Sequence, residues 1–378
     1  MNNEDQPELS NVILCGGVTW TITDSQVSSD DRFMIHSTLS QYCQMLDIRD
    51  GTYTKELDLG DRENPDSQSY FNKTKIFCLD LCGDDKEFVA GCNKKIEGAS
   101  VKIYDIERDI VKQSVVCHKD DVNGVCYLEK NNNTMFISSS DDGTSKVWDT
   151  RILKNNEPAG IFYGHVSGIT YVESKNDGRH FITNSKDQSL KLWDLRKFTT
   201  QKKNHPYLKY DYRCEVLTPS HIQEIKEYQK KLDDSIMTFW GHQVHQTLIR
   251  CHFSPLSSTG QRYICTGSFD GRVYIFDTVT GENVVALEIP KEGDSIFHCP
   301  VVRDCVWHPY TQSLISTSFL GGIYRFEYRD LRDGERIEEE TMETENEVNQ
   351  EDEGQAYRLC YRSNGMVSVR GDSINNCS

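Results

Sequence analysis

Three histidine–aspartate pairs are the residues in this sequence best suited to acid–base chemistry. They are His118 with Asp142, His165 with Asp187, and His242 with Asp270. An imidazole beside a carboxylate is an arrangement that general acid–base catalysis uses. The same pairing recurs along the chain, however, and one active site would not be repeated in this way. We therefore expect these pairs to be buried, fully hydrogen-bonded elements of a repeated structural unit.

Motifs for other kinds of catalysis or metal binding do not occur in the sequence. It contains no phosphate-binding loop, no nucleophile elbow and no zinc-binding helix of the His-Glu-x-x-His type. Its 14 cysteines are scattered and form no Cys-x-x-Cys pair, so we expect buried, reduced thiols and no metal or other cofactor. We predict that the protein is not an enzyme. A propeller enzyme with an unfamiliar site in a central channel is an alternative.

The strongest signal is an internal repeat. Residues 136–151 align with residues 181–196 without a gap, and Trp148 and Trp193 lie 45 residues apart. A repeat of this length with a Trp-Asp pair is typical of a four-stranded blade of a WD-repeat β-propeller. The short apolar runs suit buried strands, and the polar turns between them suit hairpins.

Six repeats can be recognised, with ends near residues 48, 106, 150, 195, 278 and 328. We therefore predict an all-β protein, with a disordered N-terminus at 1–10 and a WD-repeat β-propeller of six recognisable blades over 11–330. Trp193 and Phe276 lie 83 residues apart, nearly two repeats, and we assign the excess to an insertion at 197–235 rather than to a degenerate blade.

The insertion contains one predicted helix. Thr218-Pro219-Ser220 could begin it, and apolar residues then recur at helical spacing, namely Ile222, Ile225, Tyr228 and Leu232. The helix either packs on the rim of the propeller or binds a partner, because long loops on rigid scaffolds often carry function.

Charge is concentrated near the C-terminus. The net charge is −17, and residues 335–353 hold ten acidic residues and one arginine. We expect an acidic, disordered tail over 331–378, which either only solvates the protein or binds a basic partner. The rest is mildly acidic, which disfavours nucleic-acid binding. No apolar stretch of about 18 residues predicts a membrane span.

Two blade endings resemble a known docking signature. The segments Trp148-Asp149-Thr150-Arg151 and Trp193-Asp194-Leu195-Arg196 are similar to those of receptors that dock cullin-4 ubiquitin ligases through the ligase's propeller adaptor. Longer stretches resemble the family of WD-repeat protein 23, also called cullin-4-associated factor 11; they are residues 118–125, 164–175, 247–260 and 302–309. The resemblance covers roughly residues 15 to 330.

The resemblance implies a seven-bladed substrate receptor in the cytoplasm and nucleus. Its partners would be the adaptor, damage-specific DNA-binding protein 1, and substrate proteins that include stress-response transcription factors, which would be ubiquitinated for proteasomal degradation. The implied adaptor-binding residues are Arg151, Arg196, Trp148, Asp149, Trp193 and Asp194. The family has a further blade and an N-terminal docking segment before the region that matches Trp20, and we expect this chain to lack both.

Two alternatives remain open from the sequence. Arg151 and Arg196 could instead form surface salt bridges with a neighbouring blade. The whole protein could be a general WD-repeat scaffold of a protein complex without a ligase role.

Overall fold

The structure is a computed structural model, and it describes residues 21–60, 73–153, 156–201, 203, 218–245, 247–289, 301–319, 321–327, 355–361 and 367–373. The chain divides into two compact units, one spanning Pro7–Cys251 and the other containing His252–Ser378. Each unit is described by itself.

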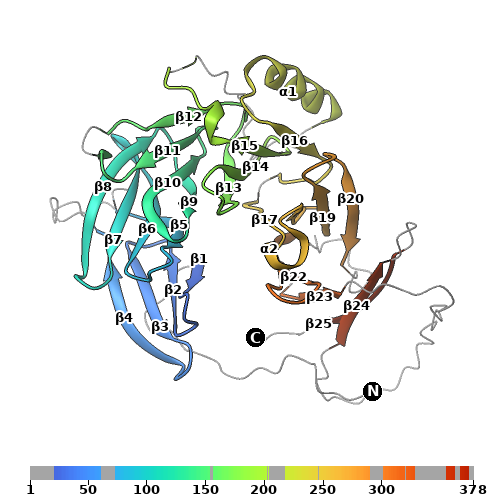
Figure 1. The fold of residues 1–378 in the computed structure, drawn as a ribbon, viewed down its shortest axis with the longest axis horizontal. Helices are drawn as coiled ribbons and strands as arrows, with labels where there is room; N and C mark the ends of the chain where they lie inside the picture. Colours follow the sequence, from blue (N-terminus) through green and yellow to red (C-terminus); the bar gives the residue numbers. More distant parts are fainter. Residues whose placement is uncertain are drawn as a thin grey trace. The chain divides into compact units, whose positions relative to one another are not determined.

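The first unit contains four antiparallel four-stranded sheets, which we call blades A to D (Figure 1). Blade A consists of β1 (Ile22–Val27), β2 (Phe33–Thr38), β3 (Tyr42–Asp47) and β4 (Thr52–Asp58), and blade B of β5 (Ile76–Leu81), β6 (Glu87–Lys95), β7 (Gly98–Asp105) and β8 (Ile110–His118). Blade C consists of β9 (Val122–Glu129), β10 (Asn132–Ser140), β11 (Ser145–Asp149) and β12 (Gly160–Phe162), and blade D of β13 (Ile169–Ser174), β14 (His180–Ser185), β15 (Ser189–Asp194) and β16 (Met237–Trp240).

The second unit contains blades E and F. Blade E has four strands, β17 (Cys251–Phe253, at the boundary between the units), β18 (Tyr263–Thr266), β19 (Arg272–Asp277) and β20 (Asn283–Glu288). Blade F has three strands among the described residues, β21 (Val302–Trp307), β22 (Ser313–Ser318) and β23 (Ile323–Glu327). The strands β24 (Gln355–Tyr361) and β25 (Val367–Ser373) form a separate hairpin, and the short helix α2 (Leu256–Thr259) follows β17.

Blades C and D, which carry the sequence repeat, have the same aromatic pair between their second and third strands. Phe136 pairs with Trp148 across blade C, and their rings stack at 6.3 Å; Phe181 and Trp193 do the same in blade D at 5.9 Å. Both tryptophans are 1% exposed. The buried aromatic residue of each third strand therefore fills the space between neighbouring sheets, where aromatic side chains bury the most surface.

The six predicted blades are confirmed, and so is the helical insertion. The third strands end within one residue of the predicted blade ends, at Asp47, Asp105, Asp149, Asp194, Asp277 and Glu327. The short 3-10 helix η3 (Leu195–Lys197) ends where the predicted insertion begins, and the insertion holds the helix α1 (Pro219–Leu232). All nine cysteines identified as free among the described residues are buried.

Two predictions concern residues that the structure does not describe. The N-terminus at 1–10 and the acidic run at 335–353 lie outside the described residues. The range 331–378 also contains the hairpin of β24 and β25; the disorder of the tail stays a prediction.

Candidate functional site

The predicted pair His118–Asp142 lies at the centre of a buried network that joins His118, the last residue of β8 in blade B, to blade C. The Nδ1–H of His118 donates to Asp142 Oδ2 at 3.0 Å, and His118 Nε2 lies 2.8 Å from Ser138 Oγ. The indole N–H of Trp148 donates to the same Ser138 Oγ at 2.8 Å. Since an indole N–H can only donate, the serine hydroxyl is left to donate to Nε2. The chemistry of the partners thus assigns a neutral imidazole with its proton on Nδ1.

Burial and charge set the protonation of this pair. Burial lowers the pKa of His118, since a charged imidazole would be desolvated there. Burial alone would raise the pKa of Asp142, but the imidazole of His118 and the hydroxyl of Thr144, which donates at 2.6 Å, hold that pKa well below its usual range. The carboxylate therefore stays ionised while fully hydrogen-bonded.

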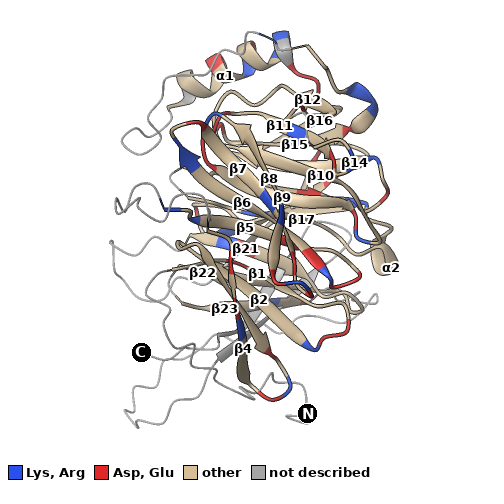
Figure 2. Ribbon diagram, turned by 90° about the vertical axis from the view of Figure 1, so that its left-hand side faces the viewer, with Lys and Arg blue, Asp and Glu red and all other residues tan. Residues whose placement is uncertain are grey.

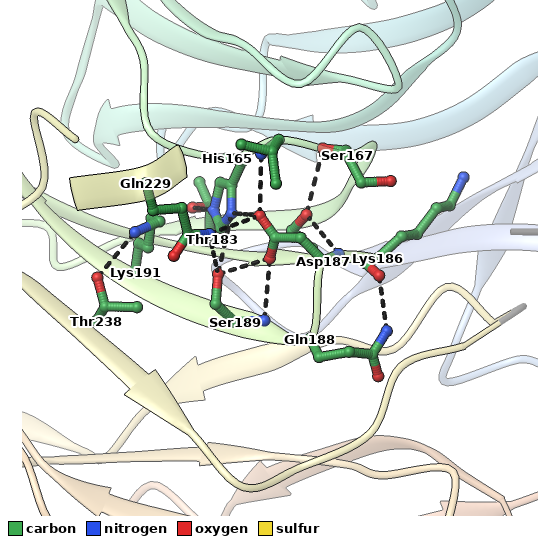
Figure 3. Close-up of polar contacts among 12 residues, drawn as sticks. His165, Ser167, Thr183, Lys186, Asp187, Gln188, Ser189, Lys191, Gln229 and Thr238 are labelled. Atoms are coloured by element: carbon green, nitrogen blue, oxygen red, sulfur yellow. Dashed lines mark hydrogen bonds and ion pairs between the residues drawn. The ribbon is translucent and has the colours of Figure 1, made fainter. Parts of the chain in front are cut away.

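Blade D repeats the network with a threonine in place of the serine (Figure 3). His165 Nδ1–H donates to Asp187 Oδ2 at 3.0 Å, its Nε2 lies 2.6 Å from Thr183 Oγ1, and Trp193 Nε1–H donates to that oxygen at 2.8 Å. The side chains of His165 and Asp187 are both 0% exposed. The structure thus contains two of the three predicted pairs, each buried at the centre of a hydrogen-bond network.

The third predicted pair, His242 with Asp270, joins residues of different units and stays a prediction. In the first unit His242 Nε2 lies 2.8 Å from Asn184 Oδ1. In the second unit Asp270 Oδ2 accepts a hydrogen bond of 2.8 Å from the hydroxyl of Tyr274. Blade E also has Phe276 where blades C and D have tryptophan, so it lacks the indole donor.

The predicted adaptor-binding arginines share one geometry. Arg151 donates to Asp149 from Nε at 2.8 Å and from Nη2 at 2.6 Å, and Arg196 donates to Asp194 from Nε at 3.2 Å and from Nη2 at 2.9 Å. Their side chains remain 69% and 68% exposed. Each arginine thus contacts an acid of its own blade, and among the described residues neither forms the alternative salt bridge to a neighbouring blade.

The turn after the third strand positions these arginines. The backbone N–H of Arg151 donates to Asp149 Oδ1 at 3.0 Å, and Arg196 makes the same bond to Asp194. The hydrogen bonds from Arg151 lower the pKa of Asp149. Blade A has the same turn, since the N–H of Arg49 donates to Asp47 Oδ1 at 2.9 Å. Sequence reasoning missed Arg49 because Leu46 stands where tryptophan would mark the motif.

Two further arginines, each the residue just before the second strand of its blade, reach the equivalent aspartates. Arg179 donates to Asp194 at 2.7 Å, and Arg262 donates to Asp277 from Nε and Nη2 at 2.9 and 2.6 Å. The aspartates that end the third strands of blades C, D and E therefore each accept hydrogen bonds from an arginine side chain, which either follows that strand or precedes the second strand.

Comparisons with known proteins agree with this geometry. The family model for the WD domain, G-beta repeat, matches residues 111–149, 156–194 and 234–277. The LEC14B protein of Lithospermum erythrorhizon is 38% identical over 343 residues, which cover 85% of this chain and 66% of that protein. The DDB1- and CUL4-associated factor 11 homolog of Caenorhabditis elegans is 32% identical over 327 residues, or 81% of this chain and 51% of that protein. The chain belongs to the WD-repeat family that includes these proteins.

The DDB1- and CUL4-associated factor 11 homolog of Caenorhabditis briggsae is 34% identical and matches 66% of this chain. The chain thus spans between 43% and 66% of the length of these three WD-repeat relatives. Two solved WD-repeat structures, those of U3-55K and of the RRP9 WD40 repeats, match 82% of the chain with a TM-score of 0.57 at 13% identity and cover 78% and 77% of their own chains. At this identity they show the fold alone.

The insertion ties the two arginine-bearing blades of this WD-repeat protein together. Thr199 pairs with Ile161 of β12 through hydrogen bonds of 3.0 and 2.9 Å, and Asp234 N–H donates to the carbonyl of Tyr163 at 2.9 Å. Between these points α1 lies beside blade D, where Lys226 Nζ sits 4.7 Å from the ring centre of Trp240. The insertion thus leaves blade D, runs along the outer strand of blade C and returns.

The helix α1 begins where the sequence predicts. The hydroxyl of Thr218 accepts from the backbone N–H of His221 at 3.4 Å, which caps the first turn. Ile225 and Gln229 are buried, while Gln223, Glu224, Glu227, Lys230 and Lys231 are exposed. Figure 2 shows both acidic and basic residues along the helix. Packing on the blades is therefore confirmed, and partner binding by the exposed face stays a prediction.

Metal and membrane sites are not seen in the described part of the chain. No group of three or more His, Cys, Asp or Glu side chains there could hold a metal ion. Neither α1 nor any other described helix is long and apolar enough to cross a bilayer.

Proposed function

We propose that this chain is a protein-binding, non-catalytic propeller that serves as a substrate receptor of a cullin-4 ubiquitin ligase. On this proposal Arg151 and Arg196, with the Trp-Asp pairs that precede them, contact the ligase's propeller adaptor. The names of the worm relatives associate those proteins with DDB1 and CUL4. The receptor would deliver substrates, stress-response transcription factors among them, for ubiquitination and degradation in the cytoplasm and nucleus.

The observation that carries the proposal is the matched pair of exposed guanidinium groups. Blades C and D follow each other in the chain. In both, the third strand ends at an aspartate, and the arginine two residues later donates hydrogen bonds to it from Nε and Nη2. A guanidinium has five N–H donors, so each arginine keeps donors for a partner. Two groups fixed in the same way at equivalent ends of β11 and β15 would suit one acceptor-rich surface.

The aspartates supply rigidity as well as charge. A free arginine side chain loses conformational freedom when a partner binds it, and this cost weakens binding. Asp149 and Asp194 already hold Nε and Nη2 in the folded protein. The arginine side chains therefore lose less conformational freedom when a partner binds. A planar, directed donor held in place is what distinguishes arginine from lysine at such contacts.

The test is a pull-down of the purified adaptor with the double variant Arg151→Glu/Arg196→Glu. Both side chains are exposed, so the variant should fold, since surface changes of this kind usually cost less than about 0.5 kcal/mol. We expect it to lose adaptor binding while its circular dichroism spectrum and melting temperature stay unchanged.

The matched control is Lys230→Glu/Lys231→Glu on α1, which changes the charge by the same amount at exposed sites of the same unit. It should bind like the wild type. Binding retained by the folded arginine variant would remove Arg151 and Arg196 from the docking surface. Failure of the wild type to bind would favour the second candidate, a general WD-repeat scaffold without a ligase role.

A further inference from the structure

The turn after the third strand is built alike in blades A to D. In each blade an aspartate ends the strand and accepts a hydrogen bond from the backbone N–H of an arginine two or three residues later. Blade A has the pair Asp47 and Arg49, and blade B has Asp105 and Arg108, each with an N···Oδ1 distance of 2.9 Å. An aspartate that accepts such hydrogen bonds stabilises a turn. All four described blades of the first unit therefore present an arginine at the same point.

The four turns lie on one face of the first unit. Hydrogen bonds join the inner strands β1, β5, β9 and β13 of neighbouring blades, and they come in the same order along both strands of each pair. Between β5 and β9, for example, Cys78 contacts Val122, and further along Asp80 contacts Tyr127. The inner strands thus run in the same direction. Because the first and third strands of an antiparallel blade also run in the same direction, the third strands all end on the same face.

The arginines of blades A and B are open to solvent. Arg49 is exposed, and the side chain of Arg108 is 74% exposed, close to the values for the arginines of blades C and D. A guanidinium has five N–H donors. Arg49 and Arg108 can therefore donate hydrogen bonds to a partner that binds this face.

Exposed apolar side chains accompany three of the four arginines. Ile48 and Ile152 are sequence neighbours of the arginines of blades A and C, and Phe198 lies two residues beyond that of blade D. They are 38%, 53% and 45% exposed. The ring of Phe198 lies so close to Gly160 of β12 that a side chain on residue 160 would overlap it, so this ring is held in place. Arginine and aromatic residues around an apolar centre are typical of protein–protein interfaces.

Acidic residues are interspersed with these arginines. Asp50 follows Arg49, and Glu107 precedes Arg108 and pairs with Lys86 at 3.4 Å. A polyanion such as nucleic acid needs a continuous basic surface, which this face does not offer. A partner gains more from directed hydrogen bonds to each guanidinium and from the apolar side chains between them.

We propose that the four turns form one docking face for a folded protein, in which Arg49 and Arg108 bind the partner as well as the arginines of blades C and D. Ile48, Ile152 and Phe198 supply its apolar contacts. The partner's surface spans the four blades and offers carboxylate or carbonyl oxygens between apolar side chains. With the ligase adaptor as this protein, the inference rests on the proposed function and extends its site from two blades to four.

The test measures binding of the purified adaptor to the full chain by biolayer interferometry. We expect Arg49→Glu/Arg108→Glu to weaken binding at least about tenfold, because each change removes donors and places a carboxylate opposite the partner's acceptors. The matched control is Lys94→Glu/Lys119→Glu, which makes the same change of charge at exposed sites of blade B, at the opposite end of its strands. It should bind like the wild type, and both variants should keep the wild-type melting temperature.

A second pair of variants tests the apolar contacts. Ile152→Ser should weaken adaptor binding about fivefold, whereas Ile96→Ser, at a residue that is 92% exposed in the turn between β6 and β7, should leave it unchanged. Raising the NaCl concentration from about 0.1 to about 0.5 M should weaken wild-type binding less than about tenfold, because salt screens charges and not apolar contacts.

The outcomes separate this inference from the proposed function. Binding kept by the folded Arg49→Glu/Arg108→Glu variant but lost by Arg151→Glu/Arg196→Glu would overturn the four-blade docking face and leave the proposed function standing. Failure of the wild type to bind the adaptor would overturn both. Loss of nearly all binding at high salt would mean recognition by charge alone, as for a polyanion, and would contradict the apolar contacts.

Discussion

Gln229 of α1 donates a hydrogen bond of 3.0 Å to Asp187 Oδ2, the same oxygen that receives the Nδ1–H of His165 (Figure 3). Its amide also lies 3.3 Å from Ser189 Oγ. A side chain from the insertion thus completes the buried network of blade D. Gln229 is 4% exposed. A buried polar contact therefore holds the helix on the blade, in addition to apolar packing.

We expect loss of the Gln229–Asp187 hydrogen bond to lower the stability of the protein. We expect Gln229→Ala to lower the free energy of unfolding by about 1.5–3 kcal/mol, the usual effect for a buried hydrogen bond to a charged group. Gln223→Ala, on the exposed face of α1, should change it by less than about 0.5 kcal/mol. Urea denaturation of both variants measures the difference, and equal midpoints would mean that the Gln229 contact contributes nothing.

Stability should fall as the pH is lowered below neutral. Burial lowers the pKa of His118 and of His36, so the unfolded chain binds these protons near pH 6.5 while the folded chain resists them. Because the unfolded state then holds more protons, stability decreases as the pH falls through that region. The carboxylates of Asp142 and Asp187, whose pKa values lie below the usual range, add a further loss below about pH 4.

This pH dependence can be followed as the urea midpoint at pH 7.5, 5.5 and 4.5, which should decrease in that order. A midpoint that stays constant between pH 7.5 and 5.5 would show that the buried imidazoles do not resist protonation.

Arg250 should be a strong stabiliser of the first unit. Its guanidinium lies 2.8 Å from Asp24 Oδ1, donates to the carbonyl of Thr23 at 3.0 Å and stacks 5.1 Å from the ring centre of Tyr171. The arginine side chain is 15% exposed and that of Asp24 is 3% exposed. It therefore links the inner strands of blades A and D through a charge pair that is largely excluded from solvent.

Removing one partner of such a pair leaves the other charge buried. We expect Arg250→Ala to cost about 3–5 kcal/mol of stability, whereas Arg108→Ala, at a residue that is 74% exposed, should cost less than about 0.5 kcal/mol. Thermal or urea unfolding compares them. Similar midpoints for the two variants would contradict the structural role of Arg250.

The aspartates that hold the docking arginines provide a finer test of the proposed function. Asp149→Asn and Asp194→Asn keep both guanidinium groups but weaken the hydrogen bonds that orient them. Each should weaken adaptor binding about two- to tenfold, the effect of one side chain that must be ordered on binding. Titration by biolayer interferometry would show it, and unchanged affinity in both variants would mean that orientation by these aspartates is irrelevant.

The repeated parts of the molecule could be predicted from the sequence, and the contacts between distant segments could not. Trp148 and Trp193 mark the period, and each period fixes where its own histidine and aspartate must stand. The partners of Asn184 depend instead on the chain beyond blade D: its amide donates to the carbonyl of Ile249 at 3.1 Å, and its Oδ1 faces His242. No local sequence pattern predicts that Asn184 contacts Ile249 and His242.

Gln229 shows the same limit for the insertion. Helical spacing correctly placed Ile225 on the buried face, because apolar periodicity reports which side of a helix avoids water. A buried glutamine breaks that pattern, and its reason is a carboxylate 42 residues away in sequence. Arg179 reaches Asp194 in a comparable way, since both residues come close only after the second and third strands have paired.

The anchored insertion also offers a place to attach a label. Lys203 Nζ contacts the carboxylate of Asp234 at 2.7 and 2.9 Å, and Thr218 caps α1, so residues 204–217 join two ends that other contacts already fix. Doubling the length of a chain segment between two fixed ends costs only about 0.6 kcal/mol. A biotin-acceptor peptide placed within 204–217 would therefore leave the blades and the arginines untouched, and would give a fixed point for immobilising this protein on a sensor surface.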